Sequence, residues 1–129
     1  MLEIGLKGTA QTVVVPENTA VAMGSGALEV FATPGMVALM EKAAMESVQP
    51  HLEEGQGTVG IGLEVLHLAA TPVGMTVRAE SELTVIDGRT LRFHVKAYGG
   101  EELIGEGTHT RCIVLNERFM AKALAKREK

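Results

Sequence analysis

The segment that decides the fold is ATPGMVALMEKAAMESV, residues 32–48. Thr33 suits an N-cap, because its hydroxyl can accept a hydrogen bond from an exposed backbone N–H. Pro34 suits the first helical position, where the missing N–H costs nothing, so we predict a helix from Pro34 to near Pro50. Apolar residues occupy most of its circumference: Met36, Val37, Leu39, Met40, Ala43, Ala44, Met45 and Val48. A helix of this kind is covered on nearly all sides, either by a sheet or by a partner subunit.

One residue of this helix differs from its neighbours. At helical spacing, Glu41 lies on a row with three apolar residues, Ala38, Met45 and Val48. An unpaired carboxylate in such a position is costly to bury. We therefore predict that Glu41 is paired, protonated or involved in chemistry.

The remainder of the chain is predicted to be mostly strand. Residues 9–15, TAQTVVV, form a first strand that Pro16 ends. After the helix, residues 57–74 hold a second strand, and a last strand runs from about Glu102 to Leu115. The order is therefore a strand, a buried helix and a meander of four strands. This order predicts the α+β class, with one long helix against an antiparallel sheet of about five strands.

The two strands in the middle of the meander show the clearest alternation of apolar and polar residues. Asp87-Gly88 fits a tight two-residue hairpin turn between them, and Gly99-Gly100 supplies the next turn. One face of the pair is apolar, whereas the other faces water. The predicted inward residues are Val77, Ala79, Leu83, Val85, Leu91, Phe93, Val95 and Ala97.

A histidine lies on an apolar face of the strand in residues 57–74. If no bulge changes the register, His67 shares its face with Val59, Ile61, Leu63 and Val65. Taken alone, such a histidine is more often a satisfied core residue than a functional one. However, the helix that this strand would cover carries Glu41 two turns, or seven residues, after Pro34, so the carboxylate lies on the same side of the helix as its N-terminus, where Thr33 is. We predict that a ligand between strand and helix meets all three side chains.

Composition limits the classes of protein that fit. The chain has 129 residues, 46% hydrophobic and 22% charged, which predicts a single domain over residues 1–129. The single cysteine, Cys112, and the lack of a signal-like or membrane-spanning segment favour a reducing, cytoplasmic location. A net charge of −4 argues against nucleic acid as a partner. The four histidines and one cysteine lack metal-ligand spacing, so we expect no metal and no cofactor.

Three segments resemble a known family. FATPGMVALMEKA (31–43), HLAATPVG (67–74) and GEGTHTRCIV (105–114) are similar to segments of the fluoroacetyl-CoA thioesterase-like family of hotdog-fold thioesterases. Order and spacing match from about Thr9 to Lys122. The resemblance implies a long helix wrapped by an antiparallel sheet, and a homodimer with acyl-CoA sites at the subunit interface. Coenzyme A is then part of the substrate rather than a cofactor.

The resemblance also implies roles for individual residues. Thr33, Glu41 and His67 correspond to the catalytic threonine, glutamate and histidine of the family. Gly60 corresponds to a glycine whose backbone N–H holds the thioester oxygen, and Arg111 to a substrate-site arginine. The helix N-terminal N–H groups of Gly35 and Met36 are alternative donors for this oxygen.

Two further segments bear on the substrate. The passage AMGSGALEV, residues 22–30, resembles a lid over the site but lacks the aromatic residues found in the fluoroacetyl-specific enzyme. We therefore expect an adaptable pocket for short to medium acyl-CoA esters, with fluoroacetyl-CoA disfavoured. A C-terminal basic cluster is the first candidate for binding the phosphates of coenzyme A, although a solvated helix end is the simpler explanation of the cluster. Its members are Lys122, Lys126, Arg127 and Lys129.

Three functions fit these observations. The first is acyl-CoA hydrolysis, in which His67 removes a proton from Thr33 or from a water, and Glu41 orients the imidazole. The acyl group is then transferred to Thr33, to Glu41 as a transient anhydride, or directly to water. The second is a non-catalytic acyl-CoA or small-ligand binding protein with the same fold. The third is a dimeric structural protein in which Glu41 pairs with Arg111 or His67, Thr33 is only a helix cap, and His109 is an ordinary strand residue.

Overall fold

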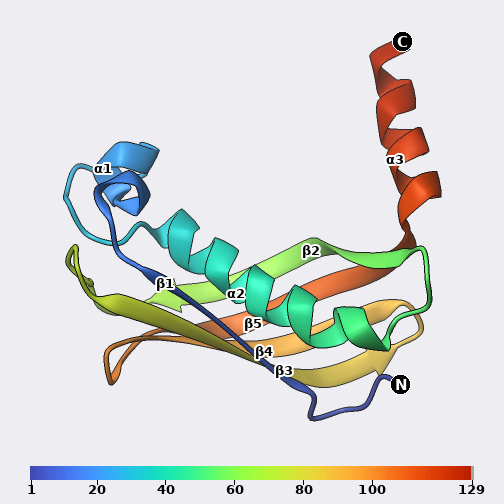
Figure 1. Cartoon of the computed structure of the whole chain (residues 1–129), viewed down its shortest axis with the longest axis horizontal. Coiled ribbons are helices and arrows are strands. Elements are labelled where there is room, and N and C mark those ends of the chain that lie inside the picture. The colour runs from blue at the N-terminus through green and yellow to red at the C-terminus, as the bar shows by residue number, and fades with distance from the viewer. Residues whose placement is uncertain (129) are drawn as a thin grey trace.

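A curved antiparallel sheet and one long helix in its hollow form the body of the molecule (Figure 1). The computed structural model describes residues 1–128. The α+β class and the five strands predicted from the sequence are confirmed. The elements, in chain order, are β1 (Lys7–Val13), α1 (Ala20–Met23), α2 (Thr33–Val48), β2 (Gln56–His67), β3 (Thr76–Asp87), β4 (Thr90–Gly99), β5 (Glu102–Leu115) and α3 (Asn116–Leu124), with short 3₁₀ turns at Pro16–Asn18, Gln49–His51 and Ala125–Glu128.

Helix α2 begins one residue earlier than predicted. Thr33 is the first residue of the helix. The N-cap is Ala32, whose side chain makes no capping hydrogen bond. The predicted cap role of Thr33 is therefore wrong, because a residue inside the first turn no longer projects its hydroxyl toward the free N–H groups. The predicted end near Pro50 is confirmed, since α2 passes into the turn Gln49–His51.

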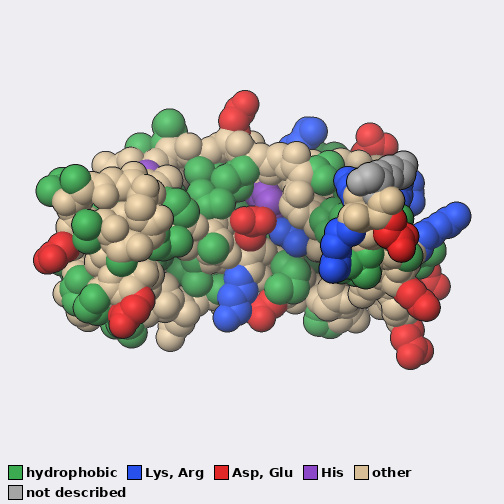
Figure 2. Space-filling view, turned by 90° about the horizontal axis from the view of Figure 1, so that it is seen from above, with side chains coloured by type: hydrophobic (Ala, Val, Ile, Leu, Met, Phe, Trp, Pro, Cys, Tyr) green, Lys and Arg blue, Asp and Glu red, His purple; other side chains and the backbone are tan. Residues whose placement is uncertain are grey.

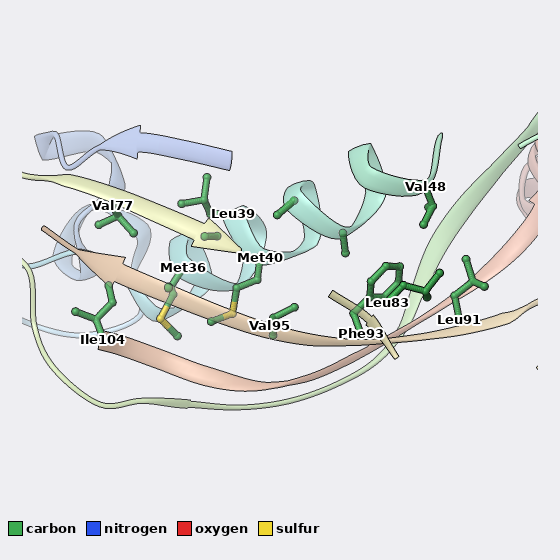
Figure 3. Packing of buried hydrophobic residues seen from close by; sticks show 14 of the residues in the cluster. Met36, Leu39, Met40, Val48, Val77, Leu83, Leu91, Phe93, Val95 and Ile104 are labelled. Atoms are coloured by element: carbon green, nitrogen blue, oxygen red, sulfur yellow. The ribbon is translucent and has the colours of Figure 1, made fainter. Parts of the chain in front are cut away.

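The core lies between α2 and the concave face of the sheet (Figure 3). The helix buries Met36, Leu39, Met40, Ala43, Ala44 and Val48. The sheet contributes Val77, Ala79, Leu83, Leu91, Phe93, Val95, Ala97 and Ile104. Each large side chain among these contributes about 1.5–3 kcal/mol when it is fully buried. The opposite side of α2, which includes Ala38, Glu41 and Met45, keeps partial exposure, so one chain alone does not cover the helix on all sides.

The strands are not arranged as a four-strand meander. The sheet order is β1-β3-β4-β5-β2, so β3, β4 and β5 form a meander while β2 pairs with β5 at the far edge. Strand β1 pairs with the other side of β3. Alternation of apolar residues predicts that a strand exists, but it does not specify its neighbour, which explains this difference.

Three register shifts interrupt the strand pairing, and those in β2 and β3 change the predicted faces. In β2 the register shifts between Gly60 and Gly62, so Ile61 is the extra residue. His67 consequently shares its face with Leu63 and Val65, whereas Val59, which pairs with Cys112, lies on the other face. A second shift, between Leu83 and Val85 in β3, turns Val85 outward, where it is 37% exposed. The predicted inward position of Val85 is therefore wrong, and the other seven predicted inward residues are buried.

The β3–β4 hairpin is confirmed, with its turn shifted by one residue. Asp87 still pairs with Thr90, so the two loop residues are Gly88 and Arg89. Gly88 has a φ of 59°, a conformation that favours glycine. The turn therefore places the side chain of Arg89 at the hairpin tip.

Strand β2 leaves one edge of the sheet unpaired. Apolar side chains on and just after it are exposed: Ile61 (58%), Leu63, Leu66 (68%) and Leu68. Seen from above, hydrophobic side chains gather between the α1 end and the C-terminal helix (Figure 2). Among residues 1–128, no helix is long and apolar enough to cross a membrane.

Candidate active site

Thr33 and His67 meet at one end of the molecule. Thr33 opens α2 and His67 is the last residue of β2, and Thr33 Oγ1 lies 2.7 Å from His67 Nδ1. This is a hydrogen-bond distance. Backbone hydrogen bonds hold the segment next to each residue. Near Thr33, the N–H of Phe31 donates to the carbonyl of Thr71 (2.9 Å), and next to His67 the N–H of Leu68 donates to the carbonyl of Ile104 (2.6 Å). Backbone pairing therefore holds the two side chains together.

A cleft of about 330 Å³ opens over this pair. Ser25 and Val30, from the passage predicted to be a lid, form part of its wall. Two backbone hydrogen bonds fold that passage back on α1, from Ala20 N to Val30 O (2.8 Å) and from Val21 N to Leu28 O (3.2 Å). The lining is mostly apolar and suits an acyl chain next to a hydroxyl and an imidazole: Ala20, Ser25, Val30, Phe31, Thr33, His67, Leu68, Ala69 and Ala70.

The imidazole of His67 is suited to accept a proton. Burial lowers the pKa of His67 below the ordinary histidine value, and the nearby backbone of Ala69 offsets part of this effect. The ring is therefore neutral at pH 7. If Nδ1 accepts from the Thr33 hydroxyl, the ring proton is on Nε2. That atom is buried, and although the backbone of Ala69 lies close to the ring, no hydrogen bond of good geometry reaches Nε2 within residues 1–128.

Glu41 belongs to a second polar cluster, further along α2. Its carboxylate Oε2 lies 3.6 Å from Arg111 Nη1, and its side chain is 42% exposed. In the part of the chain that the structure describes, no hydrogen bond or ion pair joins Glu41 to His67. The structure therefore brings Thr33 and His67 together and places Glu41 apart from them, beside Arg111.

The guanidinium group of Arg111 makes hydrogen bonds inside the fold. The residue is 6% exposed, its Nε donates to Thr58 Oγ1 (2.8 Å), and its Nη2 donates to the Thr58 carbonyl (2.9 Å). Its Nη1 lies 3.1 Å from His109 Nε2, and His109 Nδ1 donates to the carbonyl of Gly62 (2.8 Å). The chain of contacts thus runs from Glu41 through Arg111 and His109 to the bulge of β2. A role for Arg111 in binding substrate stays a prediction.

The tautomer of His109 follows from these contacts. Because Arg111 can only donate, His109 Nε2 is the acceptor and Nδ1 carries the proton. Burial lowers the pKa of His109, and the positive charge of Arg111 lowers it further. The hydrogen bond to the Gly62 carbonyl and the charge of Glu41 raise this pKa, but by less. Burial also lowers the pKa of Arg111, and the charge of Glu41 offsets only part of this shift. His109 is therefore neutral, and it connects the arginine to the bulge.

Sequence reasoning did not single out Thr58 or His109 as site residues. One signal was present, because His109 and Arg111 are two residues apart in a strand and therefore share a face. Thr58 had no such signal, since its contact with Arg111 depends on the bulge that follows it.

Gly60 lies against the Glu41 cluster. A Cβ at Gly60 would be 2.9 Å from Glu41 Oε2 and 3.2 Å from His109 Cε1, so a side chain does not fit there without displacing them. Within one chain Gly60 therefore faces Glu41, not the Thr33–His67 pair. Its predicted part in holding the thioester oxygen stays a prediction.

Lys122 lies at the opposite end of β2 from the cleft. It lines a pocket of about 360 Å³ with Arg89, Val114, Leu115, Arg118 and Phe119, which we call the basic pocket. Lys126 and Arg127 are not part of its lining. Lys129 lies outside the described residues. No three His, Cys, Asp or Glu side chains among residues 1–128 are grouped as metal ligands would be.

Comparisons with known proteins agree on one family. A family model described as fluoroacetyl-CoA-specific thioesterase matches residues 14–117. The fluoroacetyl-CoA thioesterase of Streptantibioticus cattleyicolor is 46% identical over 98 residues, which are 76% of this chain and 70% of that protein. A solved structure of the fluoroacetyl-CoA thioesterase FlK has a TM-score of 0.92 at 39% identity, covering 98% of each chain. A threonine-to-serine variant of FlK, solved in complex with acetyl-CoA, has a TM-score of 0.91 at 38% identity over 97% of this chain and 98% of that one.

Proposed function

The chain belongs to the fluoroacetyl-CoA-specific thioesterase family and is an acyl-CoA thioesterase, and from this premise we propose that it hydrolyses short to medium acyl-CoA esters in the Thr33–His67 cleft. The observation that carries the proposal is the 2.7 Å contact between Thr33 Oγ1 and His67 Nδ1. It joins a hydroxyl to a neutral imidazole at an apolar cleft of about 330 Å³. A nucleophile next to its base is what acyl transfer requires.

The reaction begins with proton transfer from Thr33 to His67. As the hydroxyl proton moves to Nδ1, Oγ1 bonds to the thioester carbonyl carbon. The C–S bond then breaks, and the coenzyme A thiolate takes the proton from His67. Water next attacks the threonine ester with His67 again as the base, which releases the carboxylic acid and restores the Thr33 hydroxyl.

The thioester oxygen, which becomes negative during attack, needs hydrogen-bond donors. Pro34 has no N–H, and the N–H of Met36 already donates to the carbonyl of Ala32 (3.0 Å). This leaves Gly35 as the better helix donor, at the positive end of the helix dipole. Gly60 remains the strand candidate.

We propose that Glu41 completes the catalytic set across a dimer interface. In the catalytic arrangement above, His67 Nε2 carries a proton and needs an acceptor, yet this buried atom has no partner in residues 1–128. Glu41 lies on the side of α2 that the sheet leaves partly exposed. A second copy packed on that side would desolvate the carboxylate and bring it near an imidazole.

The proposed dimer forms along β2. A 12-residue edge strand with exposed apolar side chains is a template for pairing with another strand. Two copies joined there would also cover the exposed side of α2. A cytoplasmic location, with Cys112 reduced, is part of the same proposal.

A panel of acyl-CoA esters of increasing chain length tests the proposed activity, with free thiol measured as it is released. We expect turnover of short and medium esters with a graded preference, since each methylene contributes only about 1–3 kcal/mol of discrimination. Fluoroacetyl-CoA belongs in the panel and is expected to show no special advantage. Binding of acyl-CoA without thiol release at any chain length would favour the non-catalytic alternative.

A further inference from the structure

His109, in β5, is a buried histidine that belongs neither to the lining of the cleft nor to the basic pocket. The residue is 2% exposed, and its ring stacks on that of Phe93 with 6.3 Å between the ring centroids. Its Nδ1 donates to the carbonyl of Gly62 (2.8 Å), and its Nε2 lies 3.1 Å from Arg111 Nη1. A buried ring that is bonded through both nitrogens holds the group at each end in place.

Two acceptors lie near the Nη1 group of Arg111. His109 Nε2 is 3.1 Å from it, which is a hydrogen-bond distance, whereas Glu41 Oε2 is 3.6 Å away, which is too long for one. The other two guanidinium nitrogens donate to Thr58, to its hydroxyl (2.8 Å) and to its carbonyl (2.9 Å). Arg111 therefore faces Glu41 as a charge without forming a hydrogen bond to it.

The absence of that hydrogen bond matters for the proposed role of Glu41. A carboxylate that orients an imidazole must accept its N–H, and a guanidinium bonded to the same oxygens in a bidentate manner would compete with the imidazole. Space is left for the carboxylate by Gly60, where a Cβ would lie 2.9 Å from Glu41 Oε2 and 3.2 Å from His109 Cε1. The carboxylate thus lies beside His109 and Arg111 and keeps its oxygens available.

We propose that His109 is a positioning residue for thioester hydrolysis: it holds Arg111 by a hydrogen bond and so prevents the guanidinium from bonding Glu41. The proposal rests on the thioesterase function and on the catalytic role of Glu41 given above. Burial lowers the pKa of His109, which keeps Nε2 unprotonated and able to accept. A side chain without an acceptor at this position would leave Nη1 of Arg111 unpaired, with Glu41 as the nearest available acceptor.

Two substitutions at His109 separate positioning from packing. His109→Phe keeps a ring against Phe93 but removes the donor and the acceptor, whereas His109→Gln carries both on one amide. In the folded dimer, we expect kcat for acyl-CoA to fall about tenfold or more with Phe and to return to within about threefold of wild type with Gln, with KM unchanged in both. His94→Phe, on the outer face of the sheet, is the matched control and should keep the wild-type kcat.

Three results of this comparison would overturn the proposal. A lower melting temperature of His109→Phe with wild-type kcat in the folded dimer would mean that the residue serves packing alone. An equal loss of kcat in His109→Gln would mean that the hydrogen bonds are not what matters. A higher KM with unchanged kcat would mean that Arg111 holds the substrate rather than acting on Glu41.

A double-mutant cycle tests whether His109 acts through Glu41. Glu41→Gln removes the charge that attracts the guanidinium, so adding His109→Phe should lower kcat no further than Glu41→Gln does alone. Losses that multiply in the double variant would overturn the route through the carboxylate. Wild-type turnover in Glu41→Gln would overturn the catalytic role of Glu41 and this proposal together.

A crystal structure of His109→Phe gives a result that does not depend on activity. We expect the distance between Arg111 Nη1 and Glu41 Oε2 to shorten from 3.6 Å to a hydrogen-bond distance, and to stay long in His109→Gln. A guanidinium that keeps its place in His109→Phe would overturn the proposal even in an active enzyme. If wild type hydrolyses no thioester but the guanidinium moves as expected, the thioesterase function fails, whereas the control of Glu41 by His109 is supported.

Discussion

At the residue scale, two groups compete for the hydroxyl of Thr33. The first turn of α2 offers free backbone N–H groups, and β2 offers the imidazole of His67. Because Ala32 is the N-cap, the hydroxyl bonds His67 Nδ1 at 2.7 Å. This contact is a direct path for proton transfer, and burial of the ring keeps it in the basic, neutral form.

The pH dependence of kcat/KM is predicted from the lowered pKa of His67. The base acts only when neutral, so activity is lost as pH falls through the pKa of the folded state. Burial lowers that pKa, whereas a carboxylate brought to the ring, as proposed for Glu41, would raise it. We therefore expect the acidic limb of Glu41→Gln to lie below that of wild type and below about pH 6.5, the ordinary histidine value. Rates measured with a short acyl-CoA from about pH 4.5 to 8 would show this, and a limb of Glu41→Gln above about pH 6.5 would contradict a buried, neutral base.

At the element scale, the bulge in β2 organises the second polar cluster. Ile61 is the extra residue, so Thr58 and Gly60 face the core beside Arg111. The carbonyl of Gly62, next to the bulge, accepts a hydrogen bond from His109 Nδ1 (2.8 Å). Neutral His109 in turn accepts from Arg111, whose charge faces Glu41. The bulge therefore helps to position the arginine that the Glu41 carboxylate faces.

Alanine at Gly60 and at Gly62 should have different effects. A Cβ at Gly60 meets Glu41 Oε2 at 2.9 Å, whereas one at Gly62 meets only Thr110 at 3.7 Å, an ordinary contact. Gly60→Ala should displace the carboxylate and lower turnover at least about tenfold, with about 1 kcal/mol lost in stability, because the displaced group is a flexible side-chain end. Gly62→Ala is the matched control. Equal losses of turnover in the two variants, measured beside thermal unfolding, would contradict this role of Gly60.

Features of the strands that depend on local sequence were predictable, whereas features that depend on packing between elements were less predictable. Alternation predicted β4 with Leu91, Phe93, Val95 and Ala97 inward, and all four are fully buried. The bulges depend on close approach between elements, as the contact of Gly60 with Glu41 illustrates. The neighbour of β2 depends on where the chain crosses the sheet, which a single sequence does not encode locally.

The candidate site was predicted in part. Thr33 and His67 were both singled out, and the structure brings them into contact. The pairing of Glu41 with Arg111 was only one of the alternatives, because two turns of helix separate Glu41 from Thr33 but do not tell which strand residue it faces. Arg89 and Arg118 carried no signal, since their convergence with Lys122 needs the hairpin and α3 to meet in space.

At the scale of the whole molecule, the two pockets of one chain lie far apart. The cleft lies at one end of β2, and the basic pocket lies at the other. The edge of β2 and one side of α2 are exposed between them (Figure 2). The proposed dimer along β2 would cover this apolar surface.

A charge on the free edge of β2 should prevent dimer formation. Ile61 is exposed and contributes nothing to the core of its own chain, so Ile61→Lys should fold but stay monomeric. Light scattering at micromolar concentration should report about twice 13.7 kDa for wild type and one chain mass for the variant. Ile86→Lys, an exposed isoleucine on β3, is the control and should stay dimeric. A wild-type monomer that hydrolyses acyl-CoA would contradict a shared site.

Turnover of acyl-CoA by His67→Ala is the most direct test of the Thr33–His67 pair. Loss of the general base should lower kcat by about 10²–10⁴-fold, while the melting temperature and the dimer mass stay close to those of wild type. Glu41→Gln, measured in parallel, should lose about 10²-fold if it orients the imidazole, and should instead lose stability if it only pairs with Arg111. A folded His67→Ala dimer with wild-type turnover would contradict the proposed mechanism.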